Sequence, residues 1–136
     1  MKVLFVCTGN INRSVAAEII FNSMGLGEAR SCGTGKLAFS GKGKTTAKTI
    51  RALAWLGIEA EKKIAQPIGA ELLEWADKVV VMGNPHTKYI TKNFPQYLDK
   101  VTQWDVADPH FQKGEEFHKE VVRKLKELIS HHFAPH

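Results

Sequence analysis

Residues 2–24 read KVLFVCTGNINRSVAAEIIFNSM, and this stretch decides the fold. It begins with a short apolar run, residues 3–6, which is typical of a strand covered on both faces of a parallel sheet. From Arg13 onward the apolar residues recur with a period near 3.6, which predicts an amphipathic helix. The segment CTGNIN between them is therefore predicted to be the turn that joins a buried strand to a helix.

The predicted turn places a cysteine close to an arginine. Cys7 ends the strand, and Arg13 starts the helix after five intervening residues. A helix N-terminus binds anions such as phosphate, because its backbone N–H groups are unpaired and the helix dipole is positive there. The same field and a nearby arginine favour a thiolate. A cysteine at a strand end is often only a small core residue, but in this turn we predict that Cys7 is a nucleophile and Arg13 a ligand of phosphoryl oxygens.

The segment CTGNINRS resembles the signature loop of the low-molecular-weight protein tyrosine phosphatases, which is usually written C-x-G-N-x-C-R-S. The positions that match the family pattern are Cys7, Gly9, Asn10, Arg13 and Ser14. The resemblance implies that Asn10 braces the loop and that Ser14 donates a hydrogen bond to the thiolate. Asn12 replaces the second cysteine of the family, which removes a protective disulfide within the loop and leaves the phosphoryl chemistry in place.

A general acid is predicted near the other end of the chain. A thiolate that attacks a phosphate ester needs an acid to protonate the leaving oxygen. Asp108 and Pro109, in WDVADPHF, resemble the Asp-Pro that supplies this acid in the family, although Asp-Pro elsewhere most often marks a turn. Asp105 is the alternative, and we expect it to cap or to hydrogen-bond the backbone. Where the family often has tyrosines, this chain has His110 and Phe111, and Phe111 can stack on a substrate ring.

These residues predict a phosphate-monoester hydrolase, and the resemblance implies a protein tyrosine phosphatase. The reaction would pass through phosphocysteine at Cys7, with Arg13 and the loop amides stabilising the oxygens. Asp108 would then act as the base that activates water, and neither a metal nor a cofactor is required. Phosphotyrosine-containing proteins or small aryl phosphates are the expected substrates, and phosphate and similar oxyanions the expected inhibitors. The predicted substrate-binding residues are Thr8, Gly9, Asn10, Ile11, Asn12, Ser14 and Phe111.

The rest of the chain predicts strands that alternate with helices. Further strands are predicted over residues 28–32, over residues 78–82 and from Val101, and further helices over residues 45–56 and 70–75, from Asn84 and from Gly114. This alternation predicts a single-domain α/β fold with three layers, in which a central four-stranded parallel sheet carries helices on both faces. One phosphatase-like domain would span residues 1–136, with its site at the carboxyl ends of the strands. The tail HHFAPH is expected to be frayed.

Features outside the two motifs leave more than one interpretation open. SCGTG resembles the S-A-G-T segment of the family, and the glycine-rich residues 33–44 are predicted to lie over the phosphate turn, with Leu37 and Phe39 as walls. A flexible surface loop is the alternative. Cys32 is expected to be a core residue. His86 could be a ligand or a base, but a structural or solvated histidine is favoured.

Composition limits the function classes further. The net charge of +5 favours acidic partners, but the basic residues are scattered and no nucleic-acid-binding motif accompanies them, so nucleic acid is not expected. Only two cysteines, no signal peptide and no segment long enough to span a bilayer predict a cytoplasmic protein without a membrane partner.

Two other functions are compatible with parts of the sequence. Thioredoxin-coupled arsenate reductases share this fold and loop, but they pass a disulfide along additional cysteines, and no cysteine follows Cys32. A non-catalytic phosphopeptide- or nucleotide-binding module would need neither the nucleophile Cys7 nor the acid Asp108. The presence of both residues favours an enzyme.

Overall fold

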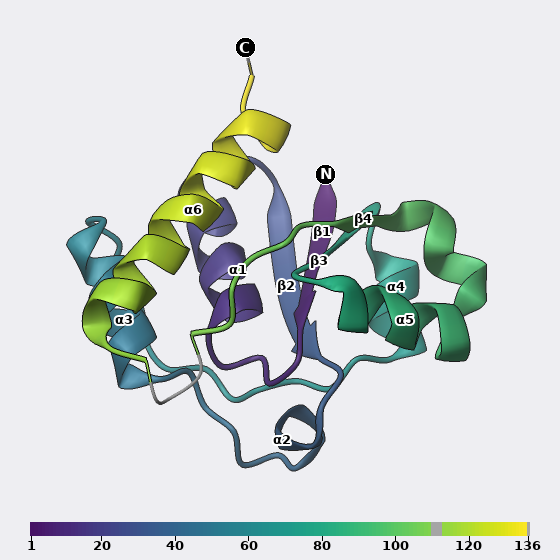
Figure 1. Ribbon diagram of the computed structural model, residues 1–136. Coiled ribbons are helices and arrows are strands. Elements are labelled where there is room, and N and C mark those ends of the chain that lie inside the picture. Colours follow the sequence, from purple (N-terminus) through teal and green to yellow (C-terminus); the bar gives the residue numbers. More distant parts are fainter. Residues whose placement is uncertain (110–112, 136) are drawn as a thin grey trace.

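The computed structural model describes residues 1–109 and 113–135. Four parallel strands form one sheet in the order β2-β1-β3-β4 (Figure 1). The strands are β1 (Lys2–Cys7), β2 (Glu28–Gly33), β3 (Lys78–Val81) and β4 (Val101–Gln103). The helices are α1 (Arg13–Ser23), α2 (Lys36–Phe39), α3 (Ala47–Trp55), α4 (Ala70–Trp75), α5 (Asn84–Asn93), the 3-10 helix η1 (Pro95–Lys100) and α6 (Glu115–Phe133).

Helices cover both faces of the sheet, which confirms the predicted three-layer α/β fold. Figure 1 shows α1, α3 and α6 on one face and α4 and α5 on the other. The central strand β1 contributes alternate side chains to two separate cores: Phe5 packs with α1 and α6, and Leu4 packs with α4 and α5. Because both of its faces are buried, β1 reads as a continuous apolar run and not as an alternating one.

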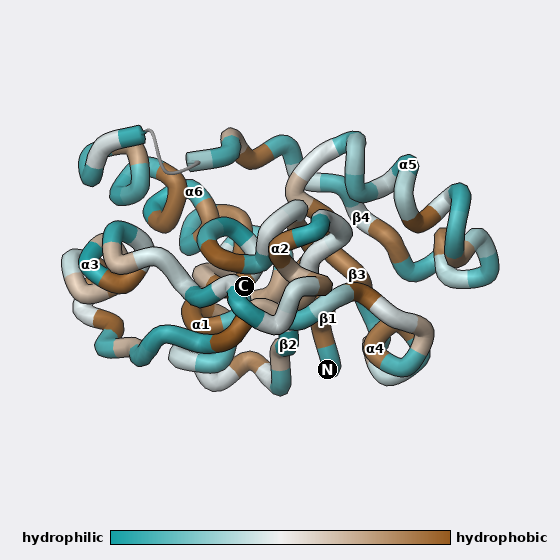
Figure 2. Tube along the Cα trace, turned by 90° about the horizontal axis from the view of Figure 1, so that it is seen from below, coloured by the Kyte–Doolittle hydropathy of each residue, from teal (hydrophilic) through white to brown (hydrophobic). Residues whose placement is uncertain are grey.

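The structure shifts the start of one predicted helix. Helix α3 begins at Ala47 rather than at residue 45, because Thr46 is its N-cap and its hydroxyl oxygen accepts the backbone N–H of Thr49 at 3.2 Å. The glycine-rich residues 33–44, for which no helix was predicted, contain the short helix α2. Figures 1 and 2 show α2 across the carboxyl end of the sheet, where β1 leads into residues 7–13, the predicted phosphate-binding turn, which is called the phosphate loop below.

The prediction that the tail is frayed is wrong as far as Phe133. Helix α6 continues through the tail because Phe133 extends the apolar stripe of Leu125 and Ile129 by one more turn. The Phe133 ring packs edge-on against Phe21, with 5.3 Å between the ring centroids, and lies 6.4 Å from the ring of Trp104. The last turn of α6 is therefore part of the core between α6, α1 and the sheet.

The two cysteines belong to opposite faces of the sheet. Cys7 packs in the core with α1 and α6, and Cys32 packs in the core with α4 and α5. Both are free thiols, and side chains that leave a sheet on opposite faces cannot form a disulfide without movement of the backbone. Burial, and secondarily the charge of Cys7, raise the pKa of Cys32 well above its usual value. Cys32 is a neutral core thiol, as predicted.

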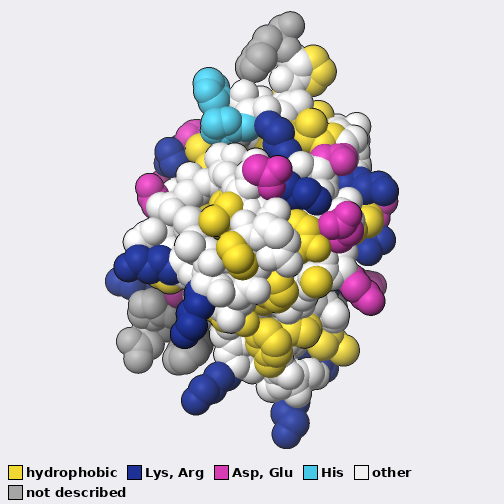
Figure 3. Space-filling model, turned by 90° about the vertical axis from the view of Figure 1, so that its right-hand side faces the viewer, with side chains coloured by type: hydrophobic (Ala, Val, Ile, Leu, Met, Phe, Trp, Pro, Cys, Tyr) yellow, Lys and Arg dark blue, Asp and Glu magenta, His cyan; other side chains and the backbone are white. Residues whose placement is uncertain are grey.

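The surface carries both signs of charge. On the face shown in Figure 3, which is the side of α4 and α5, Lys and Arg side chains are interspersed with Asp and Glu. None of the helices in the described part of the chain is long and apolar enough to cross a membrane. Nor do the described residues bring together three His, Cys, Asp or Glu side chains that could hold a metal ion.

Candidate active site

The segment from Cys7 to Arg13 forms a tight loop around the Cys7 sulfur. The backbone N–H of Asn10 donates to Cys7 Sγ at 3.3 Å, and Ser14 Oγ lies 2.9 Å from the same atom. Cys7 is only 2% exposed, so these contacts replace most of the water around its sulfur. The N-terminus of α1, which begins at Arg13, lies at the same loop, and its backbone N–H groups and dipole are suited to an anion there.

Asn10 holds the loop in its curved conformation. Its φ of 57° lies in the left-handed region, which asparagine tolerates better than most residues. Its side-chain nitrogen donates to Ser14 Oγ at 2.7 Å and to Ser31 Oγ at 2.9 Å, and its side-chain oxygen accepts the backbone N–H of Gln66 at 2.8 Å. Asn10 therefore connects the loop to β2 and to the segment before α4, in line with the bracing role that the resemblance implies.

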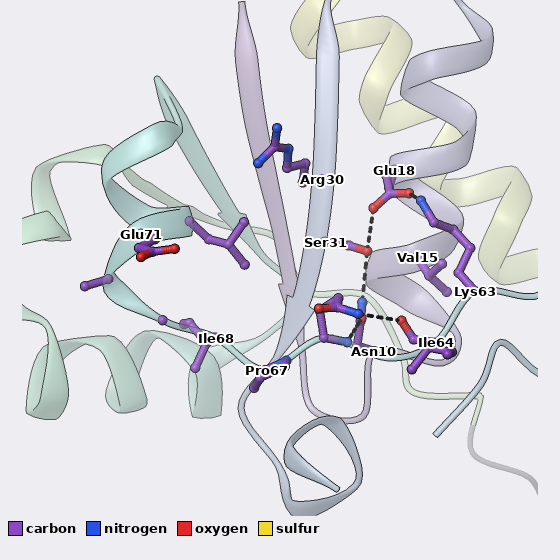
Figure 4. Close-up of a pocket in the computed structure, with 14 residues that line it drawn as sticks. Asn10, Val15, Glu18, Arg30, Ser31, Lys63, Ile64, Pro67, Ile68 and Glu71 are labelled. Atoms are coloured by element: carbon purple, nitrogen blue, oxygen red, sulfur yellow. Dashed lines mark hydrogen bonds and ion pairs between the residues drawn. The ribbon is translucent and has the colours of Figure 1, made fainter. Parts of the chain in front are cut away.

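A buried carboxylate fixes the direction of this hydrogen-bond chain. Glu18, in α1, is 4% exposed, and its Oε1 lies 2.9 Å from Ser31 Oγ (Figure 4). An ionised carboxylate only accepts hydrogen bonds, so Ser31 donates to Glu18 and accepts from Asn10. Ser14 likewise accepts from Asn10, so its single proton is shared between Cys7 Sγ, 2.9 Å away, and the backbone oxygen of Cys32, 3.3 Å away.

The sequence analysis did not predict the residues outside the loop that take part in these hydrogen bonds. Lys63 forms an ion pair with Glu18, and Ser31 and Gln66 hold Asn10. One signal was available, because Glu18 is a charged residue within a run of helix α1 that is otherwise apolar from Val15 to Phe21. The backbone contact of Gln66 carries no signal in the side-chain pattern.

Asp108 is brought to the loop by Arg13. Arg13 is 7% exposed, and its Nη1 donates to the backbone oxygen of Val106 at 3.1 Å. Its Nη2 lies 3.6 Å from Asp108 Oδ2. The Asp108 side chain is 48% exposed, so it stands at the mouth of the loop and not inside it. Asp105 accepts from the Gln103 side chain at 3.0 Å, which differs from the backbone contact that was expected.

Asn12, at the position of the lost cysteine, connects three parts of the site. Its side-chain oxygen accepts from the hydroxyls of Thr46 and Thr49, at 2.5 and 2.7 Å, which connects the loop to the start of α3. Its side-chain nitrogen donates to the backbone oxygen of Pro109 at 3.5 Å. The replacement thus supplies polar contacts to α3 and to the Asp-Pro turn.

His86 approaches the loop from α5. Its Nε2 lies 2.9 Å from Thr8 Oγ1, and the ring is 1% exposed. Burial, and then the charge of Arg13, lower the pKa of His86 to about 4. His86 is therefore neutral near pH 7 and is buried against the loop, which agrees with the structural histidine favoured from the sequence.

The glycine-rich segment lies over the phosphate loop, as predicted. The backbone N–H of Gly35 donates to the oxygen of Thr8 at 2.9 Å, and Leu37 lies close to Gly9, where a Cβ atom would be 3.7 Å from Leu37 Cδ2. Phe39 is 53% exposed, and no ring contact fixes it against another described residue. Phe111, the other predicted wall, lies outside the described residues.

Comparison with known proteins identifies a family and two relatives that are phosphatases. The family described as low molecular weight phosphotyrosine protein phosphatase matches residues 2–134. A protein-arginine-phosphatase of Bacillus subtilis is 34% identical over 143 residues, which is 95% of this chain and 92% of the relative. A similar enzyme of Geobacillus stearothermophilus is 32% identical over 118 residues, with 79% of this chain and 78% of the relative covered.

A solved structure has the same fold at a similar level of identity. The low molecular weight protein tyrosine phosphatase of T. tengcongensis superposes with a TM-score of 0.85 at 32% identity, and 96% of this chain and 95% of the other are covered. The fold and the loop thus define a cysteine-dependent phosphatase that acts on phosphorylated proteins. The chain belongs to the low molecular weight phosphotyrosine protein phosphatase family.

Proposed function

We propose that this chain hydrolyses phosphotyrosine in proteins through a phosphocysteine intermediate at Cys7, with Asp108 as general acid and then general base. The observation that carries the proposal is the convergence of a buried, hydrogen-bonded Cys7 sulfur, the Arg13 guanidinium and the Asp108 carboxyl at one loop. The Asn10 N–H that donates to the sulfur, the Ser14 hydroxyl beside it and the Arg13 cation at the same loop would stabilise the anionic nucleophile that the first step needs.

The reaction follows from where the groups lie. The Cys7 thiolate attacks phosphorus, the bond to the leaving oxygen breaks, and that oxygen takes the proton of Asp108. The loop N–H groups and Arg13 stabilise the charge on the three remaining oxygens. Water then attacks phosphorus and loses a proton to Asp108, and the sulfur–phosphorus bond breaks to release phosphate and the thiolate.

The preference for an aromatic substrate rests on the walls of the loop. Ile11 and Leu37 flank Gly9, since a Cβ atom at Gly9 would lie 3.5 Å from Ile11 Cγ1 and 3.7 Å from Leu37 Cδ2. Apolar walls stabilise a phenyl ring by burial, whereas a guanidinium group loses water there without gaining acceptors. Phe111 stays a predicted stacking partner outside the described residues.

A second candidate substrate is phosphoarginine in proteins. Two relatives at 34% and 32% identity are named protein-arginine-phosphatases. The half-exposed Asp108 carboxylate at the mouth of the loop could also accept hydrogen bonds from a guanidinium group. In this alternative the same Cys7 attack would break a phosphorus–nitrogen bond.

A direct comparison of substrates tests the proposal. Peptides of one sequence that carry either phosphotyrosine or phosphoarginine are assayed for kcat/KM, with and without a chelator. We expect at least a tenfold preference for phosphotyrosine, no effect of the chelator and competitive inhibition by phosphate. We also expect Ile11→Ala to lower kcat/KM for phosphotyrosine more than for phosphoarginine. A preference for phosphoarginine would support the second candidate substrate in place of the first. The absence of turnover of both peptides would overturn both candidates.

The cell compartment is part of the same proposal. The free thiols of Cys7 and Cys32 suit the reducing cytoplasm, and Cys7 must stay reduced to act as a nucleophile.

A further inference from the structure

A cavity of about 850 Å³ lies along the outer edge of β2, behind the phosphate loop. Figure 4 shows it between α1, which carries Val15 and Glu18, and α4, which carries Glu71. The segment with Ile64 and Ile68 lines it as well. Its volume is in the range of pockets that hold small molecules. The chemistry described above uses none of these residues to contact substrate.

The outer edge of β2 is closed at two places. In a strand, alternate residues turn both backbone groups to the same edge. The backbone N–H and C=O of Ala29 both pair with the Asn22 carboxamide. The carboxamide oxygen accepts the N–H at 2.8 Å, and its nitrogen donates to the C=O at 3.1 Å. At Gly33, the N–H donates to the Gln66 oxygen at 2.8 Å and the C=O accepts the Ile68 N–H at 2.9 Å.

Ser31 lies between these two places and leaves its backbone groups open to the cavity. Glu28 and Thr34 donate their N–H groups toward β1, at 3.0 Å each, so the odd-numbered residues of β2 face outward. Ser31 is 5% exposed and lines the cavity, and no described residue pairs with its N–H or C=O on that edge. Backbone groups that are buried and unpaired cost free energy, which a ligand with matching groups would recover.

We propose that this cavity binds a small molecule through a planar amide edge, in which one donor and one adjacent acceptor pair with the C=O and N–H of Ser31. The Asn22 carboxamide makes this same pairing with Ala29, two residues earlier on the same edge. The closed positions 29 and 33 lie about 13 Å apart along the strand. That span excludes a long added strand and selects a compact ligand.

The apolar lining defines the body of the ligand. Val15, Ile64, Ile68 and Leu72 present aliphatic side chains to the cavity, so a flat apolar ring that carries the amide fits this lining best. Among the charged side chains of the lining, Lys63 pairs with Glu18 and Arg30 pairs with Glu28. Glu71 is exposed to solvent, so none of these side chains selects a charged ligand. The ligand class is therefore a neutral lactam or carboxamide on a ring.

Occupancy of the cavity is coupled to the phosphate loop through Asn10. Asn10 also lines the cavity, and its side chain contacts Ser31 Oγ and the Gln66 N–H while it holds Ser14. A ligand that fixes Ser31 therefore stabilises the partners of Asn10. By linkage, the ligand and phosphate raise each other's affinity by the same factor.

Two matched fragments test the site. 2-Pyridone carries the donor and the acceptor, and 2-pyranone replaces only the ring N–H by oxygen. Each is titrated into the full ¹⁵N-labelled chain and followed by amide chemical shifts, with and without saturating phosphate. We expect saturable shifts at Ser31 with a Kd on the order of 1 mM for 2-pyridone, at least tenfold weaker binding of 2-pyranone, and a lower Kd with phosphate present.

Two variants provide the structural control. Ala70→Phe places a ring in the cavity from the start of α4, and Gln96→Phe adds the same ring at an exposed position of η1 away from it. We expect Ala70→Phe to abolish the shifts at Ser31 and Gln96→Phe to leave them unchanged, with phosphate binding intact in both. Equal binding of both fragments, non-saturable shifts, or shifts that phosphate displaces would overturn the site, and a Kd that phosphate does not change would overturn the coupling.

Discussion

The proposed active site has a fixed half, the phosphate loop, and an exposed half, Asp108, and the two are held in opposite ways. In the phosphate loop, Asn10 and Ser14 are almost fully buried, and both are hydrogen-bonded to neighbours from other elements. Asp108 is half exposed and has one ion pair at 3.6 Å, to Arg13. A loop that is fixed before substrate arrives spends no free energy on reorganisation, whereas an acid must reach leaving groups of different shape. In the proposed mechanism, the rigid loop would bind one anion, the phosphoryl group, and the exposed Asp108 would serve leaving groups of several shapes.

The largest expected effect comes from removing the nucleophile from the fixed half. We predict that Cys7→Ser reduces hydrolysis of an aryl phosphate to the background rate, because a serine hydroxyl is far less nucleophilic than a thiolate. Phosphate affinity should stay within about threefold of wild type, since the amides and Arg13 do the binding. Initial rates and a phosphate titration measure both quantities, and wild-type turnover in the variant would refute the mechanism.

The exposed half should give a smaller and more selective effect. We predict that Asp108→Asn lowers kcat on phosphotyrosine by about 10²- to 10⁴-fold, the range of general acid catalysis. The loss should shrink on nitrophenyl or fluorinated esters, whose leaving groups depart without a proton. Asp105→Asn is the matched control, because Asp105 contacts Gln103 and lies outside the ion pair with Arg13. A loss that is equal for all esters, or larger in the control, would reassign the acid.

The bracing of the loop can be divided into backbone strain and hydrogen bonds. Asn10→Ala loses the contacts to Ser14, Ser31 and Gln66 and keeps a φ of 57° that alanine disfavours. We predict a loss of about 3 kcal/mol in unfolding free energy and of about 10- to 100-fold in kcat. Asn10→Gly relieves only the strain, so it should recover about 1 kcal/mol and little activity. Denaturant melts and kinetics separate the two, and full recovery in the glycine variant would mean that strain alone matters.

The last expected effect is on stability alone and is a pH dependence at His86, with no change in activity near pH 7. Its pKa in the folded chain, about 4, is below the usual 6.5, so the unfolded chain binds more protons in this window. The contribution of His86 to the free energy of unfolding is therefore fully present above pH 6.5 and is lost as the pH falls toward 4. This contribution is roughly 3 kcal/mol at most. Denaturant melts of wild type and His86→Gln between pH 7 and 4 isolate this contribution. Parallel curves for the two proteins would contradict it.

The parts of the site that are local in sequence could be predicted, and the parts that depend on tertiary contacts could not. Cys7, Arg13 and Ser14 lie on one strand–turn–helix unit, so their spacing already predicts that they meet. Asp108 was assigned through a resemblance, and the structure places it beside Arg13. The hydrogen bonds that connect Glu18 to Asn10 pass from α1 through Ser31 in β2 to the loop. No spacing along the sequence encodes that these three elements meet.

The errors in the fold have the same origin. The start of α3 differs by two residues from the prediction because the hydroxyl of the N-cap Thr46, and not hydrophobic periodicity, sets where the helix begins. The tail was expected to fray because three histidines and a proline conceal the single apolar residue that matters, Phe133. The four-stranded parallel sheet was predicted because the alternation of strands and helices is a pattern of the whole chain and does not depend on one contact.

The last turn of α6 has a consequence for how the protein is made. Synthesis proceeds from the N-terminus, so β1, the phosphate loop and α1 leave the ribosome long before Phe133 does. Until then the apolar face of α1 with Ile20 and Phe21 has no cover from α6, although Cys7 has already been made. The nascent chain thus exposes this apolar surface until α6 has been made, and a chain that lacks the last turn of α6 would leave the rings of Phe21 and Trp104 without the cover of Phe133.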